Sequence, residues 1–184
     1  AIRDLPAALA EEQRLQPEQP LRIAFVGAAF KSQTNLLLAE SVDAIEEAID
    51  VNVASYVRLI HTLLPHMVAA RYGRLIYLSS FRSTTTTKGV SLYSASKAFG
   101  EKFFEVIGKE YGRLNITAVT LRMGYFDGRM VDSFPPSKIE AVTRSTSVRR
   151  LGSSQDLISA IDFAISNTYL TGGVIDLTGG LSFD

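Results

Sequence analysis

The chain reads GRLIYLSS at residues 73–80 and SLYSASK at residues 91–97. The first stretch is an apolar run ending in two serines, which predicts a strand, and the second opens an expected helix over residues 91–111. On that helix Tyr93 and Lys97 stand four residues apart, so the phenol and the ammonium share one face. A buried strand followed by a helix predicts an α/β chain in which Ser80 ends the strand.

These three side chains indicate acid–base chemistry on an oxygen atom. An isolated phenol has a pKa of about 10, and a nearby ammonium lowers that pKa toward the range in which protons exchange near neutrality. The hydroxyl of Ser80 can hydrogen-bond the same carbonyl or alcohol oxygen that Tyr93 protonates or deprotonates. Taken alone, the spacing of Tyr93 and Lys97 is also compatible with an exposed lysine one turn from a half-buried tyrosine.

Other motifs accompany this pair. They are DVNV at residues 50–53, LPHM at 64–67, RLG at 150–152 and LTGGVIDLTGG at 170–180. With these motifs the chain resembles the short-chain dehydrogenase/reductase family, and within it is similar to bacterial 3-oxoacyl-acyl-carrier-protein reductases. The resemblance implies an α/β fold with a Rossmann-like, doubly wound parallel sheet. It also implies hydride transfer between a carbonyl or secondary alcohol and NAD or NADP.

The same resemblance implies roles for single residues. The expected catalytic residues are Asn52, Ser80, Tyr93 and Lys97. Asn52 would hold a water in a proton relay toward Lys97, and Lys97 would bind the nicotinamide ribose and lower the pKa of the tyrosine. Ser80 would position the substrate oxygen, while Tyr93 transfers the proton. The other interpretation of Asn52 is a helix-interior amide that bends its helix locally.

The cofactor side departs from the family pattern. The expected cofactor-binding residues are Gly27, Ala28, Tyr93, Lys97 and Gly124. Gly27 and Ala28 lie where the family has Asn-Asn-Ala-Gly, and Gly124 follows a methionine where the family has Pro-Gly. Small residues still allow close approach of an adenosine ribose, but the amide side chains are gone. The threonine that would hold the nicotinamide carboxamide is replaced by Gly128.

We expect residues 1–184 to form a single domain that corresponds to the carboxyl-terminal two thirds of the family's domain. Gly27 is the only glycine before Gly73, so the family's glycine-rich phosphate turn and its first two strand–helix units are missing. Without a neighbouring first strand, the apolar stretch at residues 21–28 would form a bare sheet edge. This predicts either a covering partner or a longer chain.

Apolar periodicity predicts the remaining elements. Helices are expected at residues 5–15, 41–47, 50–70, 91–111, 136–147 and 154–166, and strands at 21–27, 76–80, 116–121 and 173–177. The helices at 50–70 and 91–111 carry apolar stripes too wide for one buried face. Together with the resemblance, these stripes predict a homodimer or homotetramer.

Composition narrows the class of partner. The 19 basic and 19 acidic side chains cancel, which argues against a nucleic-acid surface. No apolar run reaches the roughly 18 residues of a membrane span, and no signal segment opens the chain. A cytoplasmic protein with a small-molecule carbonyl or alcohol substrate is therefore expected. No metal site is expected, because the chain has no cysteine and His61 and His66 have no ligand partners nearby in the sequence.

Residues 125–147 correspond to the family's variable substrate loop. Four arginines in or near this loop either meet an anionic substrate or are solvated and paired: Arg122, Arg144, Arg149 and Arg150. Three functions remain open. The favoured one is an NAD(P)-dependent carbonyl reductase or alcohol dehydrogenase, and the alternatives are a non-catalytic scaffold or subunit and a nucleotide-sugar epimerase or dehydratase of the extended branch. The joint presence of the catalytic residues argues against a scaffold, and the short substrate loop argues against an epimerase.

Overall fold

The computed structural model describes residue 11 and residues 24–27, 35–128, 131 and 134–181. The expected helix at 5–15, except for residue 11, and Ala28 lie outside the described residues. The four strands form one parallel sheet in the order β1-β2-β3-β4. They are β1 (Ala24–Gly27), β2 (Gly73–Ser80), β3 (Ile116–Met123) and β4 (Val174–Leu177). Within the described part of the chain, β1 therefore stands at an edge of the sheet.

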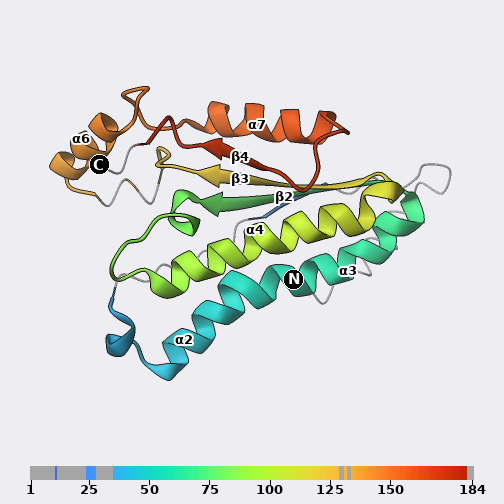
Figure 1. The fold of residues 1–184 in the computed structure, drawn as a ribbon, viewed down its shortest axis with the longest axis horizontal. Helices are drawn as coiled ribbons and strands as arrows, with labels where there is room; N and C mark the ends of the chain where they lie inside the picture. Colours follow the sequence, from blue (N-terminus) through green and yellow to red (C-terminus); the bar gives the residue numbers. More distant parts are fainter. Residues whose placement is uncertain (1–10, 12–23, 28–34, 129–130, 132–133, 182–184) are drawn as a thin grey trace.

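Helices cover both faces of this sheet (Figure 1), which confirms the doubly wound α/β class. On one face lie α3 (Ser55–Ala70) and α4 (Ser91–Tyr111), and on the other lies α7 (Ser154–Ser166). The short α6 (Pro136–Ser145) lies beyond the end of the sheet.

The central strands β2 and β3 bury both of their faces. Leu75 and Tyr77 of β2 pack with α3 and α4 in one apolar cluster. Ile76 of β2 joins Val119 and Leu121 of β3 in a second cluster, against α7. The alternation follows from the two-residue period of a strand.

β2 begins three residues earlier than the apolar run suggested. The reason is Arg74, which is only 2% exposed although it is charged. Its guanidinium donates hydrogen bonds to the carbonyl oxygens of Gly73, Asn115 and Ile165, so its donors are satisfied without solvent. From the sequence alone, an arginine at this position predicts a loop, so the expected strand began only after it.

The helices expected at 41–47 and 50–70 form one continuous rod. Ser41 caps α2 (Val42–Ile49) by accepting a hydrogen bond from the Ala44 amide at 3.2 Å. A π-helical segment, η2 (Asp50–Ala54), then leads directly into α3.

Among the described residues, no helix is both long enough and apolar enough to cross a bilayer.

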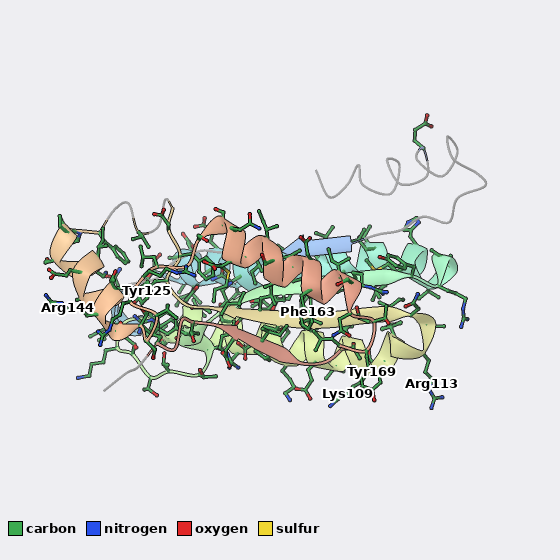
Figure 2. The ribbon with its side chains drawn as sticks, turned by 90° about the horizontal axis from the view of Figure 1, so that it is seen from above. Lys109, Arg113, Tyr125, Arg144, Phe163 and Tyr169 are labelled. Atoms are coloured by element: carbon green, nitrogen blue, oxygen red, sulfur yellow. The ribbon has the colours of Figure 1, made fainter. Side chains whose placement is uncertain are left out.

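The second half of the chain follows the expected ranges closely. α4 and α7 have the predicted bounds, and α6 ends two residues early. A capping box begins α7, where Ser153 accepts from the Asp156 amide and Asp156 accepts from the Ser153 amide. Figure 2 shows Tyr125 and Arg144 at one end of the molecule and Lys109, Arg113 and Tyr169 at the other. Because Tyr125 follows β3, its end of the molecule carries the carboxyl ends of the strands.

Candidate functional site

Three of the four expected catalytic residues meet where β2 ends and α4 begins. Ser80 is the last residue of β2, while Tyr93 and Lys97 lie in the first two turns of α4. The short helix η3 (Phe81–Ser83) and a polar loop connect β2 to α4. The carboxyl edge of a parallel sheet is where ligands bind in open α/β folds.

Tyr93 is hydrogen-bonded to Ser80 and is partly buried. Burial raises the pKa of Tyr93 above its ordinary value, while the Ser80 hydrogen bond and the positive charge of Arg82 partly offset that rise. The sequence predicted a pKa lowered by Lys97, but in this structure desolvation is the larger effect. Tyr93 is therefore a protonated phenol at neutral pH, suited to donating a proton.

Lys97 is 3% exposed, and its ammonium donates a hydrogen bond to the Leu78 carbonyl oxygen at 3.0 Å. The nitrogen lies 5.2 Å from the ring centroid of Tyr77 and 5.7 Å from that of Tyr93. Burial lowers the pKa of Lys97 to about 8, and the charge of Glu101 works against that shift. An amine with this pKa changes its charge readily within the range in which enzymes work.

Asn52 occupies the π-helical segment η2 and is 1% exposed. The segment packs against α4, so Asn52 belongs to the same layer as Tyr93 and Lys97. Single π turns inside helices recur at functional sites, because the widened turn releases a backbone carbonyl from the regular ladder. The structure places Asn52 where the α-helical hydrogen-bonding pattern changes to a π-helical one, which is compatible with both interpretations of this residue.

A charged network that the sequence did not reveal surrounds the next turn of α4. Glu101, one turn after Lys97, accepts hydrogen bonds from Ser79 at 2.7 Å and Ser83 at 2.5 Å. Arg122 at the end of β3 donates to both Glu101 oxygens, at 3.0 and 2.8 Å, and also pairs with Asp176 of β4 at 3.0 Å. Burial pushes the pKa of Glu101 upward, but the hydrogen bonds outweigh burial and hold that pKa below its ordinary value. The network ties α4 to the ends of three strands.

A family model described as short chain dehydrogenase matches residues 10–138. The chain belongs to this family. The nodulation protein G of Rhizobium sp. (strain N33) is 31% identical over 139 residues, which are 74% of the chain and 57% of that protein. The 3-oxoacyl-[acyl-carrier-protein] reductase of Pseudomonas aeruginosa is 29% identical over 177 residues, which are 95% of the chain and 71% of that protein.

Solved structures share the fold of this chain. The 3-oxoacyl-[acyl-carrier protein] reductase of Brucella melitensis superposes with a TM-score of 0.85 at 23% identity, over 100% of this chain and 69% of that one. The reductase of Agrobacterium tumefaciens C58, described with NADP bound, gives a TM-score of 0.80 at 24% identity and covers 95% of this chain and 69% of that one. The chain thus spans between 57% and 71% of these relatives.

The residues expected to bind the cofactor have different surroundings. Gly27 ends β1 opposite Tyr77, whereas Ala28 lies outside the described residues. A β-carbon on Gly124 would stand 2.9 Å from the Thr178 α-carbon, so glycine at this position allows close packing of two chain segments. The groups that suit a ribose are the Tyr93 phenol and the Lys97 ammonium, which offer hydrogen-bond donors on one face of α4.

The arginines expected near the substrate are paired, as one of the two interpretations predicted. Arg122 belongs to the Glu101 network, Arg144 pairs with Glu140, and Arg150 with Asp156. Arg149 donates to the Arg144 carbonyl oxygen. The sequence missed Arg82, whose charge reaches Tyr93, and the signal for it was its place two residues after Ser80.

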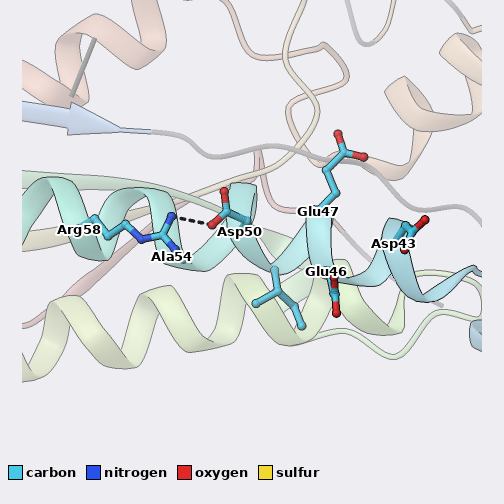
Figure 3. Close-up of a pocket in the computed structure, with 7 residues that line it drawn as sticks. Asp43, Glu46, Glu47, Asp50, Ala54 and Arg58 are labelled. Atoms are coloured by element: carbon cyan, nitrogen blue, oxygen red, sulfur yellow. Dashed lines mark hydrogen bonds and ion pairs between the residues drawn. The ribbon is translucent and has the colours of Figure 1, made fainter. Parts of the chain in front are cut away.

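The acidic side chains of α2 and η2 face an open pocket, as Figure 3 shows. Asp43, Glu46, Glu47 and Asp50 are exposed, and Asp50 pairs with Arg58 at 2.6 Å. These acidic side chains therefore form a solvated helix face. Within the described ranges, no group of three or more histidine, cysteine or acidic residues could hold a metal ion.

Proposed function

We propose that this chain forms the catalytic part of an NAD- or NADP-dependent oxidoreductase that interconverts a carbonyl compound and a secondary alcohol. The observation that supports this most is the partly buried phenol of Tyr93, hydrogen-bonded to Ser80 and one turn from the buried ammonium of Lys97. In the proposed site, residues 1–184 act as one domain on a small-molecule substrate, and a second copy of the chain covers the wide helix faces as a homodimer or homotetramer.

In the direction of reduction, Ser80 holds the substrate carbonyl oxygen by a hydrogen bond. Tyr93 gives its hydroxyl proton to that oxygen, and a nicotinamide cofactor, when bound, supplies the hydride for the carbon. The product is the secondary alcohol, and Tyr93 is left as a phenolate. Oxidation runs these transfers backward.

Lys97 serves the phenolate in this scheme. An ammonium one turn away stabilises the anion, and proton loss from an amine of pKa about 8 can restore the phenol. Asn52 passes protons onward through a water held at its π turn, and Lys97 with Tyr93 would hold the cofactor ribose. Gly27, Ala28 and Gly124 would line the remaining cofactor path.

The test is Tyr93→Phe in the protein as its source produces it. We expect hydride transfer to a panel of ketones and oxo acids to fall by at least about 100-fold, the lower range for a lost general acid. Cofactor affinity, measured by calorimetry, should fall by no more than about tenfold, because only one neutral hydrogen bond to the ribose is lost and Lys97 keeps its own.

The matched control is Tyr111→Phe at the far end of the same helix. It removes an equivalent hydroxyl away from the site and should leave turnover intact. Unchanged turnover in Tyr93→Phe would overturn the proposed role of Tyr93. An unchanged protein that binds cofactor but transfers no hydride to any carbonyl would favour the non-catalytic alternative.

A further inference from the structure

Arg82 lies next to the Ser80–Tyr93 pair, two residues after Ser80. Its backbone amide donates to the Ser80 hydroxyl at 3.2 Å, so the position of Arg82 is coupled to that of Ser80. Its guanidinium carbon lies 4.7 Å from the ring centroid of Phe81, and the guanidinium nitrogens donate to the hydroxyls of Thr87 and, at 3.4 Å, Tyr125. Stacking and two neutral acceptors thus orient the side chain.

Arg82 differs in its charge balance from three of the other four arginines around the site. Among the described residues, no carboxylate forms an ion pair with Arg82, whereas Arg122, Arg144 and Arg150 each have at least one carboxylate partner. The positive charge nevertheless acts on the site, because it lowers the pKa of Tyr93 against the effect of burial. A half-buried guanidinium with neutral partners attracts an anion, and its planar fork matches a carboxylate.

Aromatic rings lie beside the Arg82 guanidinium. Phe81 tilts against Tyr125 with ring centroids 5.1 Å apart, and Tyr125 meets Phe134 edge-on at 6.2 Å. These rings come from the segments that follow β2 and β3, so they flank the place where a substrate held by Ser80 would extend. An apolar wall next to a cation suits a short organic acid better than a neutral polar molecule.

We propose that Arg82 binds a carboxylate of the substrate, so that this site acts on oxo acids and the corresponding hydroxy acids. The inference rests on the proposed function, because it takes Ser80 and Tyr93 as the groups that hold the reacting oxygen. Arg82 then fixes the other end of the substrate and sets the distance between its carboxylate and its carbonyl.

The experiment compares acids with their neutral esters. Turnover of acetoacetate and pyruvate is measured beside that of methyl acetoacetate and methyl pyruvate, in the unchanged protein and in Arg82→Gln and Arg82→Lys. We expect Arg82→Gln to lower kcat/KM for the acids by about 10- to 100-fold, the range for a lost hydrogen bond to a charged group. The esters should change by less than about threefold, and Arg82→Lys should restore part of the loss because it keeps the charge but loses the fork.

Arg113→Gln is the matched control, since Arg113 is exposed at the opposite end of the molecule (Figure 2). It should leave acids and esters alike unchanged. An equal loss for acids and esters in Arg82→Gln would mean that Arg82 acts only by holding Ser80, which overturns the carboxylate assignment while the proposed function stands. A phosphate-bearing ketone that depends on Arg82 while acetoacetate and pyruvate do not would also overturn it.

A binding measurement separates failure of this inference from failure of the proposed function. If no carbonyl compound is turned over, calorimetry with acetoacetate on the unchanged protein and on Arg82→Gln still decides. Binding that is lost in the variant supports the carboxylate site, and equal binding or equal absence of binding in both proteins overturns it.

Discussion

Gly100 of α4 lies directly against the ring of Tyr77 in β2, so closely that a β-carbon on Gly100 would stand 2.3 Å from the ring. The ring has little room to retreat, because it stacks on Phe104 at 5.0 Å and tilts against Tyr56 at 5.2 Å. The ammonium of Lys97, three residues before Gly100, lies over the same ring. The missing side chain at Gly100 therefore sets how closely α4 approaches the sheet.

Gly100→Ala should destabilise the fold by about 1–3 kcal/mol, the range for inserting a methyl group into a packed core. Denaturant unfolding measures the change. Gly112→Ala is the control, because no heavy atom lies within 4 Å of the β-carbon that it would add. Equal stability of the two variants would show that Tyr77 yields without strain.

Glu101→Gln should cost about 2–4 kcal/mol of stability, because the largely buried Arg122 guanidinium then has a neutral amide in place of its buried carboxylate and keeps only the exposed Asp176 as a charged partner. Glu105→Gln, one turn further along α4, is the control. Glu105 pairs only with the exposed Lys102 and Lys109 among the described residues, so little change is expected. Similar losses in the two variants would contradict a special role for the Glu101 network.

The pH dependence of stability should report the buried amine of Lys97. Burial lowers the pKa of Lys97 from 10.5 to about 8 in the folded chain, and unfolding restores the ordinary value. Below pH 8 both states carry the proton, and the folded state bears the full cost of burying the charge. Between pH 8 and 10.5 the unfolded chain binds more protons, so this group makes the fold more stable as pH rises, by up to about 3 kcal/mol.

The measurement is the difference in unfolding free energy between the unchanged protein and Lys97→Met across this pH window. Methionine keeps most of the volume but does not titrate. The unfolding free energy of the unchanged protein should therefore rise relative to that of Lys97→Met as pH increases. Lys102→Met, which removes an exposed lysine from the same helix, should give a flat difference. Parallel curves for the unchanged protein and Lys97→Met would mean that Lys97 has an ordinary pKa when folded.

Local sequence patterns predicted much of the fold. The bounds of α4 and α7 followed from apolar periodicity and capping residues, which depend only on neighbours within one or two turns. β2 was harder, since the burial of Arg74 depends on carbonyl oxygens of Asn115 and Ile165, far away along the chain. Patterns that stay within one element are legible in a sequence, and partners from other elements are not.

The sequence by itself determined which residues form the candidate site, because the spacing of Ser80, Tyr93 and Lys97 is a property of one strand and one helix. Only the tertiary structure decided their electrostatics. The pKa of Tyr93 is raised and that of Lys97 is lowered because other elements remove water from both groups, and desolvation depends on what packs around a group. For the same reason the sequence did not reveal Arg82 and Glu101, because their charges act on residues of other elements that only folding brings close.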